Sequence, residues 1–136
     1  MRAQPVVLVG VAVFVYHGDE FLIGLRKGSH GAGTWGLPGG HLEYGEMAKQ
    51  AAFRELLEET NLEIEAQTLK HAGFSEAFFE HKHYVTLVMT ARCKNPSGLR
   101  LMEPEKCAEW RWVRASDLDG LPLYPPLKNY LQNNLL

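Results

Sequence analysis

The chain has 136 residues, of which 46% are hydrophobic and 22% are charged, and its formal net charge is -2. This length predicts one domain over residues 1–136, because a second core would need roughly 100 more residues. The small net charge argues against a polybasic surface for nucleic acid or for a membrane. The two cysteines, Cys93 and Cys107, are expected to be free thiols of a protein in the reducing cytoplasm.

An apolar, valine-rich run over residues 5–16 predicts a buried first strand. A secretory signal beginning at Met1 is not expected, since no small-x-small cleavage site follows the run. At about 12 residues the run is also too short to span a membrane. A turn at residues 17–19 and a second strand over residues 21–25 would complete a hairpin.

Residues 28–40 are dense in glycine and are predicted to form a loop whose backbone can approach a ligand closely. Residues 46–60 contain neither glycine nor proline and are rich in helix formers, so they predict a helix. The helix should end at Asn61, because asparagine tolerates the left-handed conformation.

The second half of the chain predicts strands near residues 69–79, 84–93 and 109–113, a turn at residues 95–98, and a short helix over about residues 127–134. Strands on both sides of a central helix, with a second helix at the end, predict an α/β (α+β) fold. We expect a mixed β-sheet sandwiched between helices.

Three carboxylates share one face of the predicted central helix. Glu55, Glu58 and Glu59 lie within a sector of roughly 100°. Their mutual repulsion would be reversed by a bound divalent cation, although a solvated acidic face explains this helix equally well. The opposite face carries the side chains expected to pack against the core, namely Phe53, Leu56 and Leu57.

The spacing around this helix resembles the Nudix box. Five residues separate Gly40 from Glu46, seven more precede Arg54, and the run to Leu62 then follows the box at every fixed position except one, where Asn61 replaces glycine. This resemblance to the Nudix family implies the Nudix fold for the whole chain.

The resemblance also implies a metal site. The expected ligands are the carboxylates of Glu55, Glu58 and Glu59 and the backbone carbonyl of Gly39. The implied cofactor is Mg²⁺, which prefers oxygen ligands, with Mn²⁺ as an alternative.

Three further positions of the box are expected to support the site without binding the metal, namely Gly40, Glu46 and Arg54. Glu46 is expected to open the helix, where its charge complements the helix dipole, and to pair with Arg54.

Stretches near Arg26, around residues 37–43 and around residues 103–107 are similar to small MutT-type Nudix enzymes. That likeness implies Mg²⁺-dependent hydrolysis of a nucleoside triphosphate, including an oxidised or modified one, to the monophosphate and pyrophosphate. Two alternatives stay open. One is a hydrolase of another diphosphate, such as a nucleotide sugar or a prenyl diphosphate, and the other is a non-catalytic nucleotide-binding module.

Catalytic roles are expected for Glu55, Glu58 and Glu105, with either Glu55 or Glu105 as the general base and Glu103 as the rival of Glu105. Arg26, at the end of the second strand, is expected to contact phosphate.

Aromatic side chains supply two further expectations. Phe78, Phe79 and Tyr124 are candidates for the walls of a nucleobase pocket. Trp110 and Trp112 alternate along a strand and are expected in the core or at an interface. Together with the strand at residues 84–89 and the leucine-rich tail at residues 131–136, they predict a homodimer, unless all of these side chains complete one core. His81 and His83 are expected at the surface and not at a metal.

Overall fold

A long first strand, β1 (Val7–His17), organises the sheet. In the computed structural model, which describes residues 5–28 and 30–134, β1 pairs in parallel with β6 (Lys82–Arg92) and antiparallel with β2 (Glu20–Arg26). The strand order is β3-β2-β1-β6-β5, with β4 added to β1 and β7 added to β2. The remaining strands are β3 (Trp35–Gly36), β4 (Gly39–His41), β5 (Lys70–Phe79) and β7 (Cys107–Val113).

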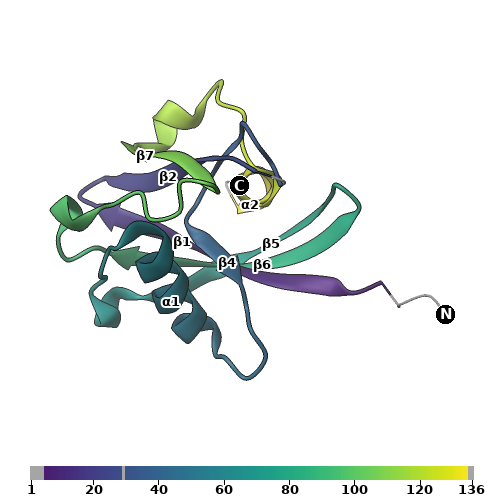
Figure 1. Cartoon of the computed structure of the whole chain (residues 1–136), viewed down its shortest axis with the longest axis horizontal. Helices are drawn as coiled ribbons and strands as arrows, with labels where there is room; N and C mark the ends of the chain where they lie inside the picture. The colour runs from purple at the N-terminus through teal and green to yellow at the C-terminus, as the bar shows by residue number, and fades with distance from the viewer. Residues whose placement is uncertain (1–4, 29, 135–136) are drawn as a thin grey trace.

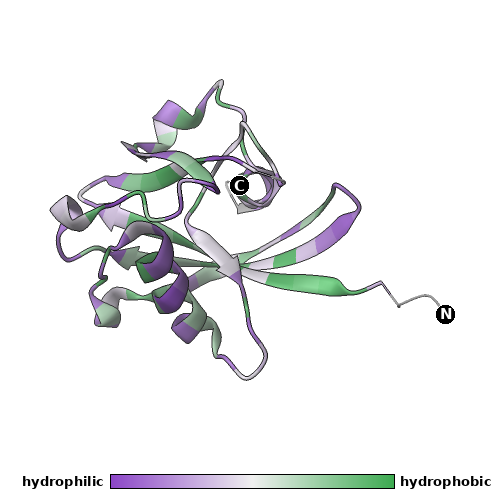
Figure 2. Cartoon of the chain, in the orientation of Figure 1, coloured by the Kyte–Doolittle hydropathy of each residue, from purple (hydrophilic) through white to green (hydrophobic). Residues whose placement is uncertain are grey.

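Two helices cover opposite faces of this sheet (Figure 1). The side chains of β1 alternate between the faces: Val11, Val13 and Val15 pack toward α1 (Ala48–Thr60), whereas Phe14 packs toward α2 (Pro125–Asn134). Figure 2 shows the resulting hydrophobic colouring along β1 and β2 and hydrophilic patches on α1. The predicted mixed sheet between helices is therefore confirmed.

Three short 3₁₀ helices complete the connections, η1 (Ala66–Thr68), η2 (Pro96–Gly98) and η3 (Ala115–Leu118). The predicted strands agree with the observed ones to within two residues at each end. The exceptions are β3 and β4, which lie inside the segment predicted as an uninterrupted loop. Both are only two or three residues long, and their pairing with β2 and β1 is not visible in local sequence.

The packing face of α1 differs from the predicted one. Leu56 is buried as expected, but Phe53 and Leu57 are 40% and 51% exposed. The buried stripe instead runs through Ala51, Ala52, Leu56 and Thr60. Because alanine is small, the helix rests on the sheet along this stripe, and Glu55 and Glu59 lie at its border.

The left-handed end of α1 at Asn61 is present as predicted, with φ 62° and its N–H donating to the Leu57 carbonyl at 3.0 Å. Cys93 and Cys107 are buried free thiols. Within the described residues, no helix is both long and apolar enough to cross a membrane. Met1, Leu135 and Leu136 lie outside the described residues.

The apolar side chains that predicted a dimer lie largely in the core. Trp110 and Trp112 are partly buried against the cluster under α1, and Tyr84, Val88 and Met89 are buried. His81 and His83 are exposed, as expected.

Candidate active site

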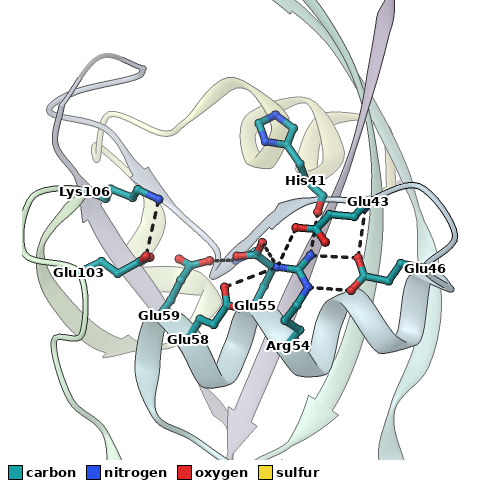
Figure 3. Close-up of polar contacts among 10 residues, drawn as sticks. His41, Glu43, Glu46, Arg54, Glu55, Glu58, Glu59, Glu103 and Lys106 are labelled. Atoms are coloured by element: carbon teal, nitrogen blue, oxygen red, sulfur yellow. Dashed lines mark hydrogen bonds and ion pairs between the residues drawn. The ribbon is translucent and has the colours of Figure 1, made fainter.

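Arg54, in the middle of α1, is the centre of a polar network that reaches the loop before this helix (Figure 3). Its Nε and Nη2 donate to the two carboxylate oxygens of Glu46 at 2.7 and 3.0 Å, its Nη1 donates to Glu55 at 2.8 Å, and its Nη2 also donates to the His41 carbonyl at 3.1 Å. The exposed carboxylate of Glu58 lies 3.5 Å from Nη1. One guanidinium therefore joins α1 to the loop that precedes it.

Glu46 makes the expected pair with Arg54 but does not open the helix. Helix α1 begins at Ala48 with Met47 as its N-cap, and no acidic side chain lies in its first turn. The Glu46 carboxylate is directed to Arg54 and to the backbone N–H of Glu43, at 3.1 Å. The hydrogen bond from Arg54 lowers the pKa of Glu46, so its role is to anchor the loop and not to complement the helix dipole.

Two carboxylates from successive turns of α1, Glu55 and Glu59, lie together under the glycines of β4. They share a hydrogen bond, and the backbone N–H of Gly39 donates to Glu59 at 3.1 Å. Burial, followed by the nearby charge of Glu55, raises the pKa of Glu59 well above its ordinary value.

Both glycines of β4 are required by close packing. A Cβ at Gly39 would overlap the Val11 backbone carbonyl, and a Cβ at Gly40 would overlap the Glu55 carboxylate. The absence of a side chain at Gly39 lets β4 approach β1, and the absence of one at Gly40 leaves space for the Glu55 carboxylate.

A second acidic segment approaches from the loop before β7. Glu103 pairs with Lys106 at 3.6 Å, and its charge contributes to raising the pKa of Glu59 (Figure 3). Glu105 is exposed, and both Glu103 and Glu105 line the cavity described below. Glu103, the rival at the sequence level, is thus the loop carboxylate that influences Glu59.

The donor set suits a hard divalent cation. Carboxylate oxygens of Glu55, Glu58 and Glu59 come from one helix, and Glu55 and Glu59 lie within hydrogen-bond distance of each other. Over residues 5–28 and 30–134, no three acidic, histidine or cysteine side chains are already arranged as a metal site. A cation here would therefore take part of its shell from water and from a ligand, as Mg²⁺ commonly does.

A cavity of about 550 Å³ extends from this acidic cluster across the sheet toward α2. At the acidic end it is lined by Glu55, Glu59, Glu103 and Glu105. At the other end it is lined mainly by aromatic and apolar side chains. These include Tyr84, Tyr124, Val88, Leu127 and Tyr130. The cavity is thus charged at one end and largely apolar at the other.

Ring contacts connect the aromatic side chains on one side of the cavity, of which His41, Tyr84 and Tyr124 line it. Tyr84 stacks on His41 at 5.7 Å and on Phe79 at 5.7 Å, and Phe79 meets the edge of Tyr124 at 5.3 Å. The guanidinium carbon of Arg26 lies 3.8 Å from the centre of the Tyr124 ring, a cation–π arrangement. Within the described residues, the guanidinium is hydrogen-bonded only through Nε, which donates to the His30 carbonyl at 3.1 Å.

Tyr124 lines the cavity as expected, but Phe78 does not. Phe78 is 73% exposed, because the strand period of two places it on the face of β5 opposite Ser75, Ala77 and Phe79. The expectation of Phe78 as a pocket wall is wrong, whereas Phe79, the other candidate on this strand, packs against the ring of Tyr124.

Sequence reasoning missed three further groups that the fold brings to the cavity, His41, Tyr84 and Thr86. Thr86 is only 6% exposed and lines the cavity. Among the described residues, the buried side-chain polar atom without a hydrogen-bond partner is Nε1 of Trp110, which also lines the cavity. The alternation of side chains along β6 predicts that Tyr84, Thr86 and Val88 point to the same side of the sheet. It does not predict that a cavity lies on that side.

Comparisons with known proteins agree with this architecture. The family model described as NUDIX domain matches residues 7–133. An oxidized purine nucleoside triphosphate hydrolase of Danio rerio is 35% identical over 112 residues, which cover 81% of this chain and 66% of that protein. A NAD-capped RNA hydrolase NudC of Yersinia enterocolitica is 31% identical over 125 residues, covering 92% of this chain and 44% of that protein.

Solved structures show the same fold. The MutT NUDIX hydrolase from Burkholderia pseudomallei superposes with a TM-score of 0.81 at 24% identity, covering 93% of this chain and 97% of that one. The chain spans between 44% and 66% of the length of the two curated relatives named above. Because the family model covers nearly all of the described chain and both relatives are hydrolases by name, the chain belongs to the NUDIX family.

Proposed function

We propose that the chain hydrolyses a nucleoside triphosphate, including an oxidised or modified one, to the nucleoside monophosphate and pyrophosphate. The observation that carries the proposal is a cavity that has a cluster of glutamates at one end and aromatic side chains at the other. A triphosphate needs charge neutralisation, whereas a nucleobase needs a ring to stack upon. The name of the Danio rerio relative, an oxidized purine nucleoside triphosphate hydrolase, supports the same substrate class.

The proposed cofactor is Mg²⁺, with Mn²⁺ as the alternative, held by Glu55, Glu58 and Glu59 and by the carbonyl of Gly39. When bound, it would neutralise charge on the phosphates and lower the pKa of an attacking water. Gly40, Glu46 and Arg54 would support these ligands, since the Arg54 guanidinium holds Glu46, Glu55 and the loop together.

The proposed proton acceptor is either Glu55 or Glu105, and Glu58 completes the catalytic set. Glu55 accepts a hydrogen bond from Arg54 at 2.8 Å, while Glu105 is exposed and has no such contact among the described residues. Glu103 lies near Glu59 and is paired with Lys106, so it is the less available base. Arg26 would place a fixed positive charge against the phosphates.

The proposed nucleobase site is the end of the cavity formed by Tyr84, Tyr124 and Thr86. The aromatic rings offer stacking surface, and the side chain of Thr86, which lines the cavity, offers a hydroxyl that can hydrogen-bond a polar ring edge. A prenyl chain would leave that hydroxyl unsatisfied, which favours a nucleobase over a prenyl group.

The free thiols and the small net charge support a cytoplasmic protein that binds a small nucleotide and neither nucleic acid nor a membrane. The proposal also includes a homodimer.

A panel experiment tests this function against its alternatives. The protein is incubated with Mg²⁺ and nucleoside triphosphates, oxidised purine triphosphates, nucleotide sugars and a prenyl diphosphate, and the products are separated by chromatography. Monophosphate and pyrophosphate from triphosphates support the proposal. Turnover confined to another diphosphate assigns the alternative substrate class, and tight nucleotide binding without turnover assigns a non-catalytic module.

A further inference from the structure

The turn between β5 and β6 holds two non-glycine residues in the left-handed conformation. Glu80 has φ 51° and His81 has φ 61°, and they form the two-residue loop of the hairpin. Two-residue loops with positive φ at both positions strongly favour Asn-Gly, because other side chains cost free energy there. The chain therefore carries strain at the tip of this hairpin, and a glutamate at position 80 needs a reason other than turn formation.

The Glu80 side chain connects the hairpin tip to the loop that follows β2. Its Oε1 accepts the backbone N–H of Gly31 at 3.1 Å, and its Oε2 lies 3.2 Å from Nδ1 of His30. The other ring nitrogen of His30 lies 2.9 Å from Nζ of Lys82, on the same hairpin. Two groups of the hairpin thus hold the backbone and the ring of a segment about 50 residues away in the sequence.

This same segment sets the position of Arg26. The His30 carbonyl accepts the hydrogen bond from Arg26 Nε at 3.1 Å. Gly31, with φ 65°, is packed so closely on Tyr124 that a Cβ would overlap the ring, and Arg26 lies on the Tyr124 ring at 3.8 Å. Residues 30 and 31 therefore fix the guanidinium at the cavity both directly and through Tyr124.

We propose that Glu80 is a positioning residue that holds His30 and Gly31 against Tyr124 and thereby aims the Arg26 guanidinium into the cavity, toward the phosphates of the substrate. The inference rests on the proposed function, because it assigns Arg26 to the phosphates. The strain at the hairpin tip is retained because it brings the carboxylate of Glu80 to the Gly31 N–H. Glu80 itself does not line the cavity.

The test uses two substitutions that each relieve strain at the hairpin tip. One removes the carboxylate of Glu80, and the other keeps it. Glu80→Asn places a residue that tolerates positive φ at the turn, and its shorter side chain no longer reaches Gly31. The matched control, His81→Gly, relieves the neighbouring residue and leaves Glu80 intact. Both variants are expected to keep or raise the Tm, since each fits the turn better than the original residue.

Their kinetics should diverge. We expect His81→Gly to match the wild type, and Glu80→Asn to lower kcat/KM for the nucleoside triphosphate at least tenfold. In an Arg26→Ala background, Glu80→Asn should have less than a twofold further effect, because the group that it positions is gone. A purely structural role predicts the opposite, a lower Tm and no dependence on Arg26. Wild-type kinetics in Glu80→Asn, or an equal loss in both backgrounds, would overturn the proposal.

A binding measurement separates this inference from the proposed function. If the wild type binds a non-hydrolysable nucleoside triphosphate analogue but turns over no triphosphate, the proposed reaction fails and the calorimetric Kd becomes the readout. The positioning role then predicts an at least tenfold weaker Kd in Glu80→Asn and an unchanged Kd in His81→Gly. Equal Kd values in all three proteins, or no binding of the analogue by the wild type, would refute it.

Discussion

The carboxylate of Glu55 occupies the space that a side chain at position 40 would fill. A Cβ built on Gly40 would overlap the carboxyl carbon and both oxygens of Glu55. Arg54 holds that carboxylate from the other side, at 2.8 Å from Nη1. The position of Glu55 is therefore defined jointly by an absent side chain on β4 and a guanidinium on its own helix.

Gly40→Ala should move Glu55 and reduce kcat by roughly 100-fold, because displacement of a catalytic group by about 1 Å has an effect of that size. Steady-state kinetics at saturating Mg²⁺ measure it, with circular dichroism as the check on folding. Gly98→Ala is the matched control, since a Cβ there meets only the Asn61 carbonyl at 3.8 Å and activity should be retained. A folded Gly40→Ala protein with wild-type kcat would contradict the importance of this placement.

Glu58→Gln and Glu59→Gln should each reduce turnover by several orders of magnitude with little loss of fold. A neutral amide has nearly the same shape as the carboxylate but is a poor ligand for a hard cation. Glu63→Gln is the control, because Glu63 is exposed and its carboxylate pairs with the exposed Lys94. Activity within about tenfold of the wild type in both variants would eliminate the proposed metal site.

The raised pKa of Glu59 predicts a pH-dependent stability of the metal-free protein. Burial raises this pKa to about 9 in the folded state, against an ordinary value of 4.5. The folded state thus holds a proton that the unfolded state loses. The stabilisation is complete below about pH 4.5 and is lost as the pH rises toward 9, at about 1 kcal/mol per pH unit.

Urea unfolding in EDTA between pH 5 and 9 measures this dependence. The free energy of unfolding of the wild type should fall across the interval, and the fall should be clearly smaller in Glu59→Gln, which cannot ionise at position 59. Parallel curves for the two proteins would mean that Glu59 is already ionised in the metal-free fold.

The fold was predictable to the extent that it rests on local patterns. Alternation along β1 and the absence of glycine and proline in α1 are properties of neighbouring residues, and both elements follow from them. The packing face of α1 was not predictable, because the helical wheel cannot show that two alanines, Ala51 and Ala52, are what rests on the sheet.

The site residues, too, were predictable where they depend on local spacing and not where they depend on long-range contacts. The box spacing predicts as site residues Glu55, Glu58, Glu59, Glu46 and Arg54, which share one helix and its preceding loop. The cavity wall depends on contacts between segments far apart in the chain, such as His41 with Tyr84 and Phe79 with Tyr124. Phe78 and Phe79 are adjacent residues of the same type, and the register of β5 decides which one faces inward.

The predicted homodimer is not tested by the structure of one chain. A homodimer was expected from apolar side chains of which Trp110 and Trp112 pack against the core under α1. The large exposed apolar side chains include Val7 on β1, Phe74 and Phe78 on β5, and Phe53 and Leu57 on α1. Sedimentation at micromolar concentration should give a species of twice the 15.3 kDa chain mass. A single species at the chain mass would contradict the dimer.

Hydrolysis in ¹⁸O-labelled water tests the central claim most directly, because it reports both the reaction and the phosphorus atom that water attacks. The glutamate cluster and Arg26 are proposed to act on a nucleoside triphosphate so that water adds to the α phosphorus and pyrophosphate leaves. Mass spectrometry of the products should therefore find one ¹⁸O in the nucleoside monophosphate and none in the pyrophosphate. Label in the pyrophosphate, release of orthophosphate, or no turnover of any nucleoside triphosphate would contradict the account.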